Sequence, residues 1–101
     1  MGTELRVSVA MSLMRALWDQ VTQEMRVVLA RLERENAIFI EFYIDGSISR
    51  ELAEIASYVE TEVIADFSSI FYISHRLIRL DAPAKVPIGD GILIFSRKEP
   101  D

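Results

Sequence analysis

The hydrophobic pattern of this chain changes its period at one dipeptide, Asp45-Gly46. Before the dipeptide, apolar side chains alternate, as in a strand whose successive residues point to opposite faces. After it, they recur every three or four residues, as on one face of a helix, at Ile48, Leu52, Ile55, Ala56, Val59, Val63 and Phe67. The chain therefore predicts a strand, a turn and an amphipathic helix in direct succession, so the fold must combine both element types.

Similar patterns predict the other elements. Polar "EREN" separates two runs rich in β-branched and aromatic residues, which is typical of a hairpin. The predicted elements are a helix over 3–19 (or from Met11), strands over 25–32 and 37–44, the helix after Ser49, and strands over 70–81 and 91–99, with a loop "APAKVPIGDG" between the last two. This order predicts a single α+β domain over residues 1–101, α-β-β-α-β-β, with two helices mainly on one face of an antiparallel four-stranded sheet.

The alternation in residues 37–44 assigns side chains to the two faces of the sheet. One set is wholly apolar and must be buried, whereas Phe39, Glu41 and Tyr43 share the opposite, wetter face. We expect the core to include Ile38, Ile40, Phe42, Leu52, Ile55, Val59 and Val63.

Negative charge is concentrated in one segment. The chain carries a net charge of −5, and residues 41–66 hold seven acids against one base, a net −6. Such a segment attracts cationic surfaces and repels nucleic acid and anionic lipid, although a solvated helix face has the same composition. On the helix, Glu51, Glu54, Tyr58 and Glu62 fall on one face. The candidate partner-binding residues are Glu41, Asp45, Glu51, Glu54, Tyr58, Glu62 and Asp66.

Acids near the C-terminal end of this helix oppose its dipole. Glu62 and Asp66 lie where a carboxylate costs roughly 0.3–1 kcal/mol if it is unpaired. Either a sheet residue such as Arg76 or Arg79 compensates the charge, or function favours it.

Residues for catalysis or metal binding are few. The chain has no cysteine and a single histidine, His75, with no acid within two positions. It contains no phosphate-binding glycine motif and no calcium loop. No apolar run approaches the ~18 residues of a membrane span. We therefore expect a protein that is not an enzyme and has no cofactor, no metal, and neither nucleic acid nor a membrane as partner.

Three stretches, "FYIDGSIS", "ETEVIADF" and "IRLDAPAKVPIGDGILIFSRKE", carry a family resemblance over roughly residues 40–99. Together they resemble small bacterial immunity proteins of contact-dependent growth inhibition and other polymorphic toxin systems. The resemblance implies a cytoplasmic, non-catalytic inhibitor that forms a toxin–immunity complex and blocks the active site of a cognate toxin, a basic nuclease domain.

Two other functions remain open from the residues. Strands such as "GILIF" at a sheet edge favour pairing between copies, so the chain can be a self-association module or a homodimer. A small enzyme would require a pocket beside His75 or the helix acids.

Overall fold

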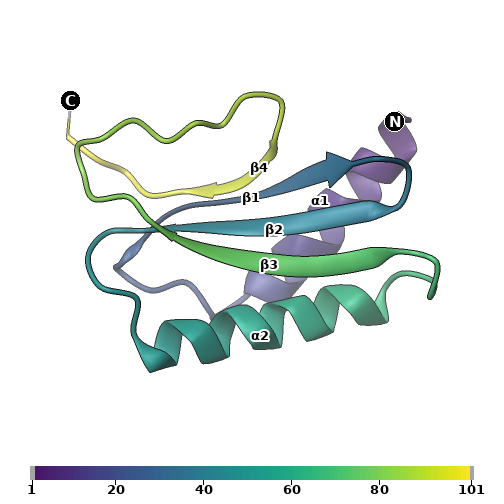
Figure 1. Ribbon diagram of the computed structural model, residues 1–101, viewed down its shortest axis with the longest axis horizontal. Coiled ribbons are helices and arrows are strands. Elements are labelled where there is room, and N and C mark those ends of the chain that lie inside the picture. Colours follow the sequence, from purple (N-terminus) through teal and green to yellow (C-terminus); the bar gives the residue numbers. More distant parts are fainter. Residues whose placement is uncertain (1, 101) are drawn as a thin grey trace.

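The strand and the helix that the two hydrophobic periods predict are both present in the structure. In the computed structural model, which describes residues 2–100, the elements are α1 (Thr3–Leu17), β1 (Met25–Glu33), β2 (Ala37–Ile44), α2 (Arg50–Ala65), β3 (Tyr72–Arg79) and β4 (Ile92–Ser96) (Figure 1). The period changes at Gly46, whose φ of 92° suits a residue without Cβ. The first helix begins at Thr3, so the alternative start at Met11 is wrong.

Helix α2 is the most predictable element. The hydroxyl of Ser49 accepts a hydrogen bond from the Leu52 backbone N–H at 3.1 Å, which caps the helix as expected. The side chains of Leu52, Ala56, Val59 and Val63 are buried, whereas Ile55 is half-buried. Within the helix the predicted apolar face is therefore confirmed, with Ile55 at its margin, whereas Ile48 lies before the helix and is 40% exposed.

The pairing of the sheet differs from the prediction. The strand order is β3-β2-β1-β4, and β2 pairs with β3 in parallel, so the sheet is mixed and the expected all-antiparallel sheet is wrong. Helix α2 is the reason, because it carries the chain back along the sheet between two parallel neighbours. β3 and β4 form no hairpin; they lie at opposite edges, joined by residues 80–91 (Figure 1).

Each face of the sheet has its own apolar cluster. Both helices pack on one face, against side chains that include Ile38, Ile40 and Phe42. On the other face, Tyr43 packs with residues from β1 and from the 80–91 connection, among them Leu29, Leu80, Val86 and Ile88.

The expectation that Glu41 and Tyr43 lie on a wetter face of the sheet is wrong. Glu41 and Tyr43 lie on the predicted face, but they are only 3% and 4% exposed. The face is not wet, because the 80–91 connection covers it.

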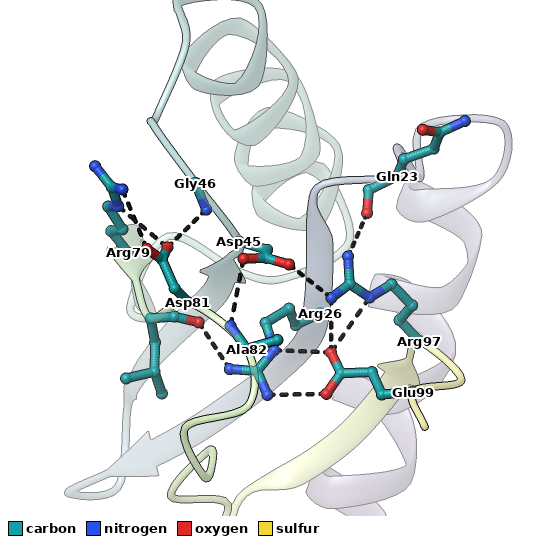
Figure 2. A network of polar contacts seen from close by, with 10 residues as sticks. Gln23, Arg26, Asp45, Gly46, Arg79, Asp81, Ala82, Arg97 and Glu99 are labelled. Atoms are coloured by element: carbon teal, nitrogen blue, oxygen red, sulfur yellow. Dashed lines mark hydrogen bonds and ion pairs between the residues drawn. The ribbon is translucent and has the colours of Figure 1, made fainter. Parts of the chain in front are cut away.

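A network of charged side chains fastens the 80–91 connection and the C-terminal segment to the sheet (Figure 2). Buried Arg26 binds Glu99 through two hydrogen bonds of 2.7 and 2.9 Å and donates a third to the Leu80 carbonyl. Arg97 donates to Asp45 at 2.9 Å and to the Gln23 carbonyl at 2.8 Å. The segment after β4 is thereby tied to the start of β1 and the end of β2.

The carboxylate of Glu99 makes this network sensitive to acid. Hydrogen bonds from Arg26, and then from Arg97, lower its pKa from 4.5 to about 2. A lowered folded pKa adds stability that is complete above the unfolded value and is lost as pH falls from about 4.5 to about 2. We expect Glu99→Gln to lower Tm clearly near neutral pH, and the difference from wild type to close toward about pH 2.

Thermal unfolding followed by circular dichroism across this pH range measures the effect. Glu35→Gln, at an exposed acid in the β1–β2 turn, is the control and should stay near wild type throughout. If the Tm of Glu99→Gln ran parallel to that of wild type at all pH values, the ion pair would not be contributing.

Candidate protein-binding surface

The exposed face of α2 carries a group of acids around one aromatic side chain. Glu51, Glu54, Tyr58 and Glu62 follow the three- and four-residue spacing of a helix and are all exposed, with Tyr58 47% exposed. Glu54 forms an ion pair with Arg50 at 3.4 Å, and both side chains are largely in solvent. Such a pair is weak, so the face keeps its negative field. We call these four residues the acidic face.

Asp66, another predicted site residue, turns from the acidic face toward α1. It accepts hydrogen bonds from Ser12 at 2.6 Å and from Arg15 at 3.0 Å. These hydrogen bonds lower the pKa of the Asp66 carboxyl, and the bond from Ser12 has the larger effect. The residue that compensates charge at this helix end is therefore Arg15 of α1, and the expected compensation by Arg76 or Arg79 is wrong for Asp66.

The other two predicted residues, Asp45 and Glu41, belong to the framework. Asp45 lies in the network of Figure 2, where it accepts hydrogen bonds from Arg97 at 2.9 Å and from the Ala82 backbone N–H at 3.3 Å. Neither Asp45 nor Glu41 lies on α2. The structure thus brings together four of the seven candidates.

Glu41 is enclosed by hydrogen-bond donors from three directions. Arg31 donates to it at 2.8 Å, Arg76 at 3.0 Å and the Tyr43 hydroxyl at 2.8 Å. Arg31 also donates to the carbonyls of Pro87 and Ile88, which draws the 80–91 connection over the cluster. Burial raises the pKa of the Tyr43 phenol, so it remains a hydrogen-bond donor at neutral pH.

His75 has an acidic partner that the local sequence does not show. Its Nδ1 lies 2.8 Å from Oε1 of Glu60, which is 15 residues earlier in the chain. Only the packing of α2 beside β3 brings the two together.

A groove of about 540 Å³ between α1 and the end of α2 is lined by Ser8, Met11, Ser12, Arg15, Asp66, Phe67, Ser68 and Phe71, and its one carboxylate is already bonded to Ser12 and Arg15. Within residues 2–100, no three potential ligands gather closely enough to hold a metal ion.

None of the helices in residues 2–100 combines the length and the apolar character that crossing a bilayer requires.

A second exposed surface was not predicted. Val7, Met11 and Met14 of α1 are 50%, 54% and 58% exposed on the side away from the core, and Trp18, the residue that caps the C-terminal end of α1, is 78% exposed. Their spacing of four, three and four residues was a signal in the sequence. The same helix has a second apolar set, including Val9 and Leu13, which is the buried one. We call these four exposed residues the apolar stripe.

Comparison with known protein families places most of the chain in one of them. A protein-family model described as "MafI2 immunity protein" matches residues 6–99. A search of curated proteins finds no match.

Proposed function

The chain belongs to the MafI2 immunity protein family, and we propose that it binds a cognate toxin and neutralises it by covering a basic active site with its acidic face. The single observation that carries the mechanism is the acidic face itself. Within residues 2–100, neither Glu51 nor Glu62 has a salt-bridge partner, and the partner of Glu54 is a largely exposed arginine.

The chemistry of a nuclease explains why an acidic face would inhibit it. A nuclease holds a polyanion and therefore surrounds its catalytic centre with lysine and arginine. Carboxylates on a helix can occupy those cationic positions, and their field accelerates the encounter. We propose a nuclease as the toxin, and the cytoplasm as the place of the encounter, since a nuclease toxin acts on nucleic acid inside the cell.

The predicted residues divide into different roles under this proposal. Glu51, Glu54 and Glu62 would pair with lysine or arginine of the toxin, and Tyr58 would add buried area and a hydrogen bond. Asp45 and Asp66 remain part of the proposed surface through their charge, although each is held by an arginine. Glu41 would act indirectly, by holding the sheet beneath.

Reversing charge on the acidic face tests the proposal. We expect Glu54→Lys/Glu62→Lys to remain folded, because both side chains are exposed, and to associate with the toxin domain encoded by the adjacent gene at least tenfold more slowly. The wild-type rate should fall as salt rises, since the screening length shrinks from ~10 Å at 0.1 M to ~3 Å at 1 M. Stopped-flow or surface-based kinetics at both salt levels measures these rates.

A matched control distinguishes an effect of the acidic face from an effect of the net charge of the protein. Glu35→Lys/Asp90→Lys makes the same change in charge at exposed loop positions outside α2 and should lose much less of the rate. Equal, salt-independent rates for wild type and Glu54→Lys/Glu62→Lys would show that the acidic face is only a solvated helix surface.

Self-association through a sheet edge remains a second candidate. The sheet is open, with β3 and β4 at its two edges, so a strand of another copy could extend it. Light scattering over a range of protein concentrations tests this. A mass of one chain at every concentration would exclude a homodimer.

A further inference from the structure

The apolar stripe of α1 exposes the side chains that helices normally bury. Val9, Leu13, Ala16 and Leu17 already fill the core side of this helix, so the stripe is surplus to folding. Single exposed apolar residues are ordinary, but four that are consecutive on one helix face indicate an interaction surface. Tryptophan and methionine are also enriched at protein–protein contacts.

A shallow apolar hollow lies at the end of the stripe. Beside Trp18, a hollow of about 230 Å³ is lined by Met14, Leu17, Val21, Ile94 and Phe95, so α1 and β4 both contribute to it. Trp18 itself is 78% exposed and stands at this hollow with no cover. A projecting aromatic beside an apolar hollow is the arrangement of an interface hot spot.

The area of the stripe limits what can bind there. One face of a 15-residue helix is about 22 Å long and about 10 Å wide. A stable interface needs about 800 Å² on each partner, so an occupant must also cover neighbouring surface. Besides β4, which lines the hollow, helix α2 is a neighbour: α1 and α2 pack side by side, and Arg15 of α1 bonds Asp66 at the end of α2.

The charge of the surrounding surface indicates which kind of protein can bind the apolar stripe. A second copy of this chain carries the same net charge of −5 and the same acidic helix, so like charges would oppose a contact that extends onto α2. A basic protein surface that also projects an apolar side chain complements both helices.

We propose that the apolar stripe, centred on Trp18, is the affinity-determining part of the contact with the basic toxin domain, and that the acidic face mainly steers the encounter. The inference rests on the proposed function and adds the residues that hold the complex together. Apolar anchors act chiefly on dissociation, whereas exposed charges act chiefly on association, so the two surfaces have different kinetic signatures.

The test compares Trp18→Ala with Leu93→Ala against the adjacent-gene toxin domain, inactivated so that it can be purified. Leu93 is 46% exposed and pairs with Leu29, so it lies on the sheet face away from the helices. We expect Trp18→Ala to weaken binding about 30-fold or more, mainly through faster dissociation, with the salt dependence of association unchanged. Leu93→Ala should stay within about threefold of wild type.

Four outcomes decide between the possibilities. Faster dissociation of Trp18→Ala, with Leu93→Ala near wild type and unchanged thermal unfolding, supports the proposal. Binding of Trp18→Ala equal to that of wild type overturns this inference and leaves the proposed function intact. Wild type that does not bind the toxin overturns the proposed function and this inference together. Trp18-dependent self-association without an effect on toxin binding assigns the stripe to a second copy and overturns the inference.

Discussion

Replacing Phe42 with alanine is expected to lower the free energy of unfolding by about 3–5 kcal/mol. Phe42 is fully buried in the middle of β2, under both helices, and its ring meets the His75 ring edge-on with centroids 6.5 Å apart. Its removal takes apolar contacts from the larger cluster and leaves a cavity that the surrounding strands cannot close. Chemical denaturation followed by fluorescence or circular dichroism gives the value.

Phe39→Ala is the matched control, because it makes the same substitution in the same strand. Phe39 points to the opposite face and is only partly buried, with Arg76 4.1 Å above its ring. We expect this control to cost less than half as much as Phe42→Ala. Equal losses at the two positions would mean that the faces of β2 are assigned wrongly.

Replacing Glu41 with alanine should cost about 3 kcal/mol, although the residue is a carboxylate in an acidic protein. The substitution leaves Arg31, Arg76 and the Tyr43 hydroxyl without their shared acceptor. The loss should be at the lower end of the range for broken buried ion pairs, because the side chains of Arg31 and Arg76 are 21% and 43% exposed and can recover water. Denaturant unfolding measures this loss as well.

Two controls separate the framework role of Glu41 from contact with a partner. Glu35→Ala removes an exposed acid from the neighbouring turn and should change stability by less than ~0.5 kcal/mol. Glu41→Gln keeps the shape of the side chain, so folded protein should associate with the toxin at the wild-type rate. A loss of association as large as that of Glu54→Lys/Glu62→Lys would instead place Glu41 in direct contact with the toxin.

Phe42 and Glu41 are adjacent in β2, but only the burial of Phe42 could be predicted from the sequence. Alternation in one strand shows that neighbouring residues face opposite ways, so the burial of Phe42 follows from residues 37–44 alone. The acidic face of α2 follows in the same way, because its spacing is local to one capped helix. The burial of Glu41 does not, because it depends on a connection some 40 residues later in the chain.

The direction in which two strands pair also could not be predicted from the alternation of residues within one strand. The order of strand, helix and strand was visible in the sequence and is compatible with a parallel pair, but only the assembled sheet shows that β3 pairs with β2 and not with β4.

Local patterns along the chain were sufficient to predict the elements, their turns, the inward face of α2 and the segment that carries the negative charge, since each depends on residues within one or two turns of one another. The three-dimensional structure was needed to show what becomes of the two apolar sets of α1: the set whose spacing predicts the helix, with Val9 and Leu13, is buried, and a second set stays exposed. Both Val9 with Leu13 and Met11 with Met14 satisfy a helical spacing. Docking of α1 against α2 and β4 buries the first pair and leaves the second, with Trp18, in solvent. The reason is physical: periodicity shows that a helix has apolar faces, but only its packing partners determine which of them loses water.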